Sequence, residues 1–417
     1  MSPTGDCGPD RLARLALATL VEPGNRELGQ LVRAVGPVVA LGRALSVAQG
    51  RPADGAISDL LSGTIVARCA AANVPVSGKG AVMIAERAIE RANRLGVRIV
   101  IPEDAEWPTR VEDLIRISRS GGSTIDKDTD PPICLWARGA GAVTDVLERS
   151  VALVGARAAT DYGVHVAADM AHDLAAREWT VVSGGAFGID AAAHRGALNG
   201  GGMTVAVLAS GIDRPYPVAN TSLFERIAEE GLLLSEWPPD SAPHRIRFLT
   251  RNRVIAAGTL GTIVVEAAAR SGARQTLGRA RQLDRQAMAV PGAIVSAMSV
   301  GCHLELREPG TRLVTNADEV IEEVGRIGEL APTRRGPVRP HDVLDPLAAR
   351  LLDAVLPRRS RTAEEIAAAA GVGGTEARRG LPMLVAAGFV VASDRGYRLA
   401  PPPTRDDAQG EASRPRG

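Results

Sequence analysis

Residues 151–163 read VALVGARAATDYG and residues 181–194 read VVSGGAFGIDAAAH, and the fold follows from these two stretches. Each begins as a short apolar run, reaches glycine, and then passes into a helical pattern, as a strand, a tight loop and a helix would. The same alternation continues in four further apolar runs: TVAVLAS (204–210), LLLSEW (232–237), TIVVEA (262–267) and QAMAVPG (286–292). Apolar strands separated by helices predict an α/β fold with a Rossmann-like parallel sheet that is buried on both faces.

The helices that separate these strands are expected over residues 162–177, 189–198, 220–230, 251–257 and 275–283. Two more strands are expected earlier in the chain, at GVRIVIP (96–102) and PPICLWARG (131–139). Right-handed crossovers place the carboxyl ends of parallel strands, and the loops that follow them, along one edge of the sheet. Open α/β sheets bind their ligands at that edge.

The chain is too long for one compact core, so several domains are expected. Helical spacing and turn signals predict a small helical N-terminal domain, which is either SAM- or helix-hairpin-helix-like or a plain accessory domain, since helices punctuated by glycine are common. Pro, Gly and Arg mark a linker near the other end. The predicted organisation is a helical domain (1–94), an extended Rossmann-like domain (95–326), a linker (327–344), a winged-helix domain (345–400) and a disordered tail (401–417).

The C-terminal pattern consists of three short helices and a hairpin. Thr362 and Glu365 have the spacing of a capping box, and the hairpin is expected to turn at residues 394–396. Arg378 and Arg379 would face solvent. Winged helices bind DNA in some proteins and other proteins in others, so the fold alone leaves both open.

The composition describes an ordinary globular protein with a formal net charge of +1. Its four cysteines are scattered without C-x-x-C spacing, which fits reduced thiols. The N-terminus lacks a signal-peptide pattern, and no run approaches the ~20 apolar residues of a membrane span. A cytoplasmic protein with no membrane partner is therefore expected.

Positive charge is concentrated in one segment. Between Asp240 and Asp284 the only carboxylate is Glu266, whereas eight arginines fall there: Arg245, Arg247, Arg251, Arg253, Arg270, Arg274, Arg279 and Arg281. A solvated helix face would carry compensating acids nearby. A basic stretch in a neutral chain is instead typical of a site for a polyanion.

The two opening loops are candidate anion sites. The first lacks the G-x-G-x-x-G spacing of dinucleotide sites but offers Gly155, then Arg157, close to the start of a helix. An arginine beside free amides at a helix N-terminus binds anions, although Arg157 could also hold its own loop. In the second loop Ser183, Gly184, Gly185 and Gly188 would let the backbone approach a phosphate closely.

Both loops, taken with AVLASGIDRPYPVAN (206–220), FLTRNRVIAA (248–257), VVEAAARSGA (264–273) and AVPG (289–292) in this order, resemble the DNA-processing protein A (DprA/Smf) family. The resemblance is strong over residues 96–324 and weaker at both ends. It implies a non-enzymatic, single-stranded DNA-binding homodimer of natural transformation, competence and recombination, which protects incoming strands and helps to load the recombinase RecA. Matched residue by residue, it implies a basic pocket built from Gly155, Arg157, Ser183, Gly184, Gly185, Phe187, Gly188, Arg247, Phe248, Arg251, Asn252 and Arg253.

The sequence departs from the family in the second loop, where Phe187 stands in place of the usual arginine. Arg245 or Arg247 would then supply the missing phosphate contact. Phe187 and Phe248 could stack on bases, which tolerates any sequence, and Phe248 could equally belong to the core.

Other functions are compatible with parts of the sequence. GTLGTIVVEA (258–267) resembles the signature of nucleotide-cleaving phosphoribohydrolases, which makes an enzyme of that kind acting through Glu266, or a nucleotide sensor, the main alternative. A protein adaptor is a third. Ser183, Asp190 and His194 lack the nucleophile elbow of hydrolases, and Asp190, His194 and Glu266 are too few for a convincing metal site. No Walker A motif is present. No catalytic residue, cofactor or metal is therefore expected.

Overall fold

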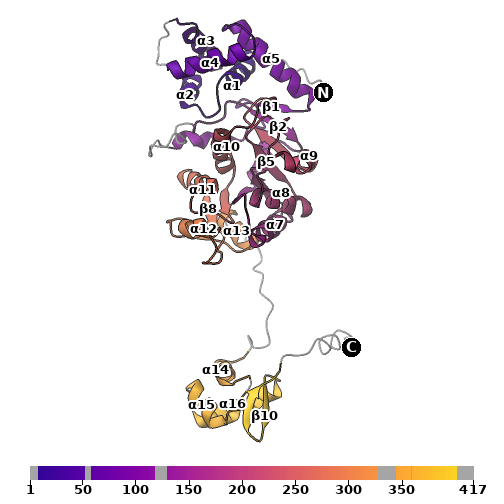
Figure 1. The fold of residues 1–417 in the computed structure, drawn as a ribbon, viewed down its shortest axis with the longest axis vertical. Helices are drawn as coiled ribbons and strands as arrows, with labels where there is room; N and C mark the ends of the chain where they lie inside the picture. Colours follow the sequence, from indigo (N-terminus) through magenta and orange to yellow (C-terminus); the bar gives the residue numbers. More distant parts are fainter. Residues whose placement is uncertain (1–7, 52–57, 118–128, 327–343, 358, 402–417) are drawn as a thin grey trace. The chain divides into compact units, whose positions relative to one another are not determined.

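The computed structural model describes residues 8–51, 58–117, 129–326, 344–357 and 359–401, which form two compact units, Met1–Pro332 and Thr333–Gly417 (Figure 1). The predicted linker lies, up to residue 343, outside the described residues, as do Cys7 and residues 402–417 of the predicted tail.

The first unit is built on a nine-stranded sheet with the strand order β1-β2-β6-β5-β4-β3-β7-β8-β9. Strands from β6 to β9 in this order run parallel, whereas β2 pairs antiparallel with both β1 and β6. The strands are β1 (Arg98–Val100), β2 (Leu135–Gly139), β3 (Ser150–Val154), β4 (Thr180–Ser183), β5 (Thr204–Leu208), β6 (Leu232–Ser235), β7 (Gly261–Val264), β8 (Gln286–Ala289) and β9 (Thr311–Leu313). The sequence therefore predicted an α/β fold with a mostly parallel sheet correctly.

Helices cover both faces of this sheet. They are η1 (Thr109–Arg116), α6 (Val143–Glu148), α7 (Asp161–Ala175), α8 (Ile189–Asn199), η3 (Val218–Asn220), α9 (Thr221–Glu230), α10 (Arg245–Gly258), α11 (Gly272–Gln282), α12 (Val300–Glu305) and α13 (Ala317–Val324). Successive side chains of β3 show the two layers. Val151 and Leu153 pack with residues of α7 and α8, while Ala152 and Val154 pack with residues of α10 and α11. This burial on both faces is why β3 reads as a continuous apolar run.

Two features of the sheet were not predicted. The edge strand β9 has only three residues, two of them exposed, so its sequence carries little apolar signal. The antiparallel direction of β2 is the other. A strand's sequence predicts its existence but not its direction, because Trp136 and its neighbours pair with residues about one hundred positions later.

Five helices precede the sheet: α1 (Pro9–Leu20), α2 (Arg26–Val35), α3 (Pro37–Ala48), α4 (Asp59–Ala71) and α5 (Gly78–Arg94). Figure 1 shows them gathered beside the β1–β2 end of the sheet. Their core is continuous with it, since Leu15 and Ile65 belong to the same buried cluster as Trp136, Leu208 and Phe224. Burial against the sheet stabilises these short helices, which would be marginal alone.

Helix α10 begins at Arg245, six residues before the predicted start at Arg251. The prediction followed the apolar RVIAA segment, but the helix begins earlier, over residues in which arginine, a good helix former, alternates with apolar side chains. This difference places Arg245 and Arg247 on the same helix as Arg251 and Arg253.

The second unit contains α14 (Pro346–Ala354), α15 (Ala363–Ala370), α16 (Gly374–Ala386) and the antiparallel hairpin β10 (Val390–Ser393) and β11 (Gly396–Leu399). Leu351, Ile366 and Leu381 form its core. The Thr362–Glu365 capping box is confirmed, and so is the hairpin turn.

Within the described part of the chain, no helix has the length and hydropathy that a membrane crossing requires.

Candidate functional site

A cavity of about 380 Å3 opens at the carboxyl ends of β3 and β7. The chain runs outward from β3 in one direction through β4, β5 and β6, then returns to the other side of β3 as β7. The cavity therefore lies where the strand order reverses, which is the ligand site of open α/β sheets. Its walls are the loops after these two strands, one side of α10 and the N-terminus of α11.

The loop after β3 brings Gly155 and Arg157 to this cavity. Arg157 is exposed, and its guanidinium carbon lies 5.3 Å from the ring centroid of Phe248 on α10. Tyr216 meets the same ring edge-on at 5.7 Å. A cation held over an aromatic face is positioned without being neutralised, so Arg157 stays free to bind an anion. Arg157 and Phe248, predicted to lie in one pocket, do lie together.

The loop after β4 packs mainly against protein. Only its Ala186 reaches the cavity lining, whereas Ser183 is buried and donates a hydrogen bond to the carbonyl of Leu153 at 2.6 Å. Asp190 accepts hydrogen bonds from the amides of Gly184 (3.2 Å) and Ala186 (3.4 Å). These amides are thus already paired with a carboxylate of their own chain.

Other protein atoms lie close to the glycines of this loop, in the space that a side chain would occupy. A Cβ on Gly184 would lie 2.3 Å from a guanidinium nitrogen of Arg251, and one on Gly185 would lie 2.4 Å from the ring of Phe224. Gly188 has a φ of +73° and would place a Cβ 2.3 Å from the carbonyl oxygen of Ala156. The glycine-rich pattern therefore reflects the packing of two loops and α10, and not only room for a phosphate. Phe187 is 47% exposed and lies outside the cavity lining.

Helix α10 contributes Phe248, Arg251 and Asn252 to the wall. Arg251 is only 4% exposed and donates to the carbonyls of Gly184, at 2.8 Å, and Val207. Burial lowers the pKa of Arg251 to about 10, which still leaves the group cationic at neutral pH. Arg251 thus holds the β4 loop and adds positive charge behind the cavity.

Two predicted residues lie elsewhere. Arg253 is fully buried, and its Nη2 lies 2.6 Å from Oε1 of Glu236. Its charge is therefore paired inside the protein and does not face the cavity. Arg247 is on the other side of α10, where it binds Glu22. The helical period separates residues that the sequence places side by side.

Sequence reasoning missed Arg270, Ser271 and Gly272, which lie in the loop after β7 and at the start of α11 and line the same cavity. Arg270 is exposed, and Ser271 caps α11 by accepting from the amide of Ala273 at 3.2 Å. Arg270 was counted in the basic segment, but it was not assigned to the pocket. The signal was present in the sequence, because an arginine followed by Ser-Gly directly before a helix has the form of an anion site.

The sequence comparisons identify the family. Residues 98–325, more than half of the chain, match the family model for DNA recombination-mediator protein A. The chain belongs to this DprA family. It is 41% identical over 395 residues to a DprA protein of Mycobacterium tuberculosis, covering 94% of this chain and 95% of that protein. It is 40% identical over 195 residues to the DNA processing protein DprA of Streptococcus pneumoniae, covering 46% of this chain and 67% of that protein.

The fold comparison agrees. The X-ray structure of DprA from Streptococcus pneumoniae aligns with a TM-score of 0.57 and 29% identity, covering 76% of this chain and 98% of that one. The resemblance that the loops suggested is therefore confirmed. The names of these DprA proteins describe DNA processing and no catalysed reaction.

The side chains considered for catalysis or metal binding have internal partners in this DprA protein. Glu266 is 2% exposed and accepts from both the amide (2.9 Å) and the hydroxyl (2.6 Å) of Thr160, the N-cap of α7. His194 is buried and bonds Thr204 on β5, and β4 and β3 separate that strand from β7, which precedes Glu266. No group of three or more metal-binding side chains occurs among the described residues.

Proposed function

We propose that this DprA-family protein binds single-stranded DNA in the cavity at the carboxyl ends of β3 and β7. The observation that carries the proposal is the exposed Arg157 held over Phe248, with Arg270 across the same cavity. We further propose that the protein acts in natural transformation as a cytoplasmic homodimer that protects incoming strands and helps to load RecA. Membership of the DprA family supports that role.

The chemistry of binding follows from the lining. Arg157 and Arg270 would neutralise phosphates and release counterions, and the amides at the start of α11 would donate hydrogen bonds to a phosphate oxygen. Phe248 would present the part of its ring that Arg157 and Tyr216 leave open, and the exposed Phe187 would offer a second stacking face nearby. Unpaired bases and a flexible backbone are needed for both contacts. Single strands satisfy these needs and duplexes do not.

The direct test is a competition experiment. A labelled single strand is bound to the full chain and challenged with unlabelled single strand, duplex of equal length and a nucleoside monophosphate. The single strand should compete best, with an affinity that falls with salt at a log–log slope of about −0.7 for each neutralised phosphate. Equal competition by duplex, or binding that ignores salt, would refute this mode.

Arg157→Ala identifies the pocket in the same assay. Loss of a charged hydrogen bond costs about 1.5–3 kcal/mol, so binding should weaken by roughly ten- to hundred-fold. Because Arg157 is exposed, the melting temperature should change little. Arg195→Ala, which removes an exposed arginine of α8, is the matched control. The phosphoribohydrolase alternative requires base release from a nucleoside monophosphate that Glu266→Gln abolishes. The burial of Glu266 against Thr160 favours a structural carboxylate instead.

We also propose that residues 345–400 form a separate winged-helix domain. The order of three helices and a hairpin around one small core supports this assignment. A chain that ends at Arg326 should stay soluble, melt at an unchanged temperature and still bind single strands, because the cavity and the sheet lie wholly before that point. Insolubility of this shorter chain would mean that the boundary is wrong.

A further inference from the structure

A second and larger cleft lies on the opposite side of α10. Its volume is about 1060 Å3, and it is enclosed by α4 and α5, by the loop that follows α1, by residues 238–244 and by α10. It shares no lining residue with the cavity at β3 and β7. It is formed where the helices of residues 8–94 meet the sheet.

Helix α5 presents a basic stripe to this cleft. Ile84, Arg87, Arg91 and Arg94 all line it and follow the three- and four-residue spacing of one helix face. Arg87 and Arg94 are exposed. They lie seven residues apart, about 10 Å along the helix axis. The stripe is therefore long enough to contact successive phosphates of an extended strand.

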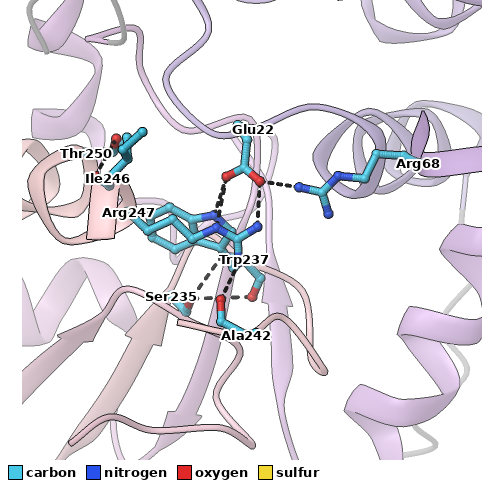
Figure 2. A network of polar contacts seen from close by, with 8 residues as sticks. All are labelled: Glu22, Arg68, Ser235, Trp237, Ala242, Ile246, Arg247 and Thr250. Atoms are coloured by element: carbon cyan, nitrogen blue, oxygen red, sulfur yellow. Dashed lines mark hydrogen bonds and ion pairs between the residues drawn. The ribbon is translucent and has the colours of Figure 1, made fainter. Parts of the chain in front are cut away.

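The cleft is positively charged overall. Five arginines and His244 line it together with two carboxylates, Glu22 and Asp240. A third carboxylate, that of Asp213 outside the lining, pairs with Arg91 at 2.7 Å, so the arginines still outnumber the carboxylates. Figure 2 shows one reason for the imbalance. The single carboxylate of Glu22 receives two guanidiniums, those of Arg247 and Arg68. Although burial raises the pKa of Glu22, hydrogen bonds from Arg247 and Trp237 outweigh it and hold the pKa below the ordinary value. Glu22 thus stays charged and fixes these two arginines while balancing only one of their two charges.

Helix α10 lines both the cleft and the cavity. Ile246, Arg247 and Thr250 line the cleft, whereas Phe248 and Arg251 line the cavity. The two sets come from opposite faces of the helix, whose first turn carries the exposed Arg245.

We propose that the cleft between α5 and α10 is a second binding site for the phosphate backbone of single-stranded DNA, used by strands too long for the cavity alone. The proposal rests on the proposed function, since the strand must first occupy the cavity. Short strands bind at the cavity, and longer strands gain affinity by running over the first turn of α10 to the α5 stripe.

The test compares strand lengths in a double variant, Arg87→Ala with Arg94→Ala. Full-length protein is titrated with thymidine oligonucleotides of about 6 and about 30 nucleotides, a range that spans usual single-strand site sizes. We expect unchanged affinity for the short strand and about tenfold weaker binding of the long strand. The log–log salt slope for the long strand should become less steep by about 1.4, which is two phosphates at about 0.7 each. Arg43→Ala with Arg195→Ala, two arginines outside both linings, is the control with equal charge change.

A second variant tests the same cleft if the first one folds poorly. Ala242 is exposed and lines the cleft, so Ala242→Glu adds a negative charge there while its backbone carbonyl still accepts from Arg247. It should weaken long-strand binding selectively. Equal losses for both lengths, or no loss for the long strand in either variant, would overturn the cleft proposal. If the unaltered protein bound neither strand, the proposed function would be overturned instead. If thymidine monophosphate competed with the long strand but not with the short one, the cleft would be a nucleotide site, and the proposal of a second strand site would be wrong.

Discussion

Arg253 and Arg157 were expected to share one pocket, and they represent two different regions of the molecule. Arg253 is fully buried between α10 and the end of β6, where it faces Glu236. Arg157 is exposed at the end of β3, over an aromatic ring. Both have the same chemistry and lie next to matched family motifs. The comparison teaches that a basic segment contains arginines that hold the fold together as well as arginines that can meet a ligand.

Burial decides which role each arginine has. A buried guanidinium must be paired, because desolvation of an unpaired charge costs several kcal/mol. Even in its pair with Glu236, Arg253 leaves Nε and Nη1 without a hydrogen-bond partner among the described residues. An exposed guanidinium has lost little hydration and gains from a phosphate. Perturbing buried cations should therefore change stability, and perturbing exposed ones should change binding.

The largest expected effect is on the buried ion pair. Arg253→Ala leaves Glu236 buried and unpaired, and breaking such a pair typically costs about 3–5 kcal/mol of unfolding free energy. Chemical denaturation of the variant measures this loss. The double variant Arg253→Met with Glu236→Leu should recover most of it, since the remaining charge is removed as well. If the Arg253→Ala protein were as stable as the parent, buried arginines would not differ from exposed ones in their effect on stability.

A buried imidazole should make the stability depend on pH. His194 is enclosed, and burial lowers its pKa to about 3 from an ordinary 6.5, aided by the charges of Arg251 and Arg195. Thr204 donates its hydroxyl proton to the carbonyl of Val181 at 2.7 Å, so Nδ1 of a neutral His194 must donate to Thr204 at 2.8 Å. Below pH 6.5 the unfolded chain takes up a proton that the folded chain refuses, and stability falls as the pH decreases toward 3.

Between pH 7 and pH 5 this group should cost about 2 kcal/mol, from about 1.4 kcal/mol for each pH unit below 6.5. Unfolding free energies at both pH values check the loss. His194→Gln should abolish this part of the pH dependence, whereas His165→Gln, at a side chain that is 75% exposed, should keep it. Asp190, whose pKa burial raises, is present in all three proteins and cancels in the comparison. An unchanged pH dependence in His194→Gln would contradict the assignment.

The smallest expected effect concerns Arg270, the other exposed arginine of the cavity. Arg270→Ala should weaken single-strand binding by about three- to tenfold, less than Arg157→Ala, because no aromatic ring of the described residues lies beneath Arg270 to fix its position. Its unfolding free energy should match that of the parent. Fluorescence anisotropy with a labelled strand measures the first quantity and denaturation the second. A loss of stability in place of affinity would place Arg270 with the structural arginines.

The sequence by itself determined the layers of the fold and pointed to the edge of the sheet where the proposed site lies. Short apolar runs such as VALVG (151–155), repeated between helical patterns, indicate central strands, and parallel strands bring the loops after them to one edge. The loop motifs were sufficient to identify the DprA family and to bring Arg157 and Phe248 together. These inferences depend on local periodicity and on short motifs, which the sequence contains directly.

Only the tertiary structure decided which basic residues face which space. Arg247, Arg251 and Arg253 lie within two turns of one helix, yet the first meets Glu22 of the helical region, the second supports the β4 loop and the third is enclosed with Glu236. Those partners come from segments far away in the chain. A helix turns by about 100° for each residue, so the direction of each side chain depends on where α10 packs, and that packing is fixed by the whole core.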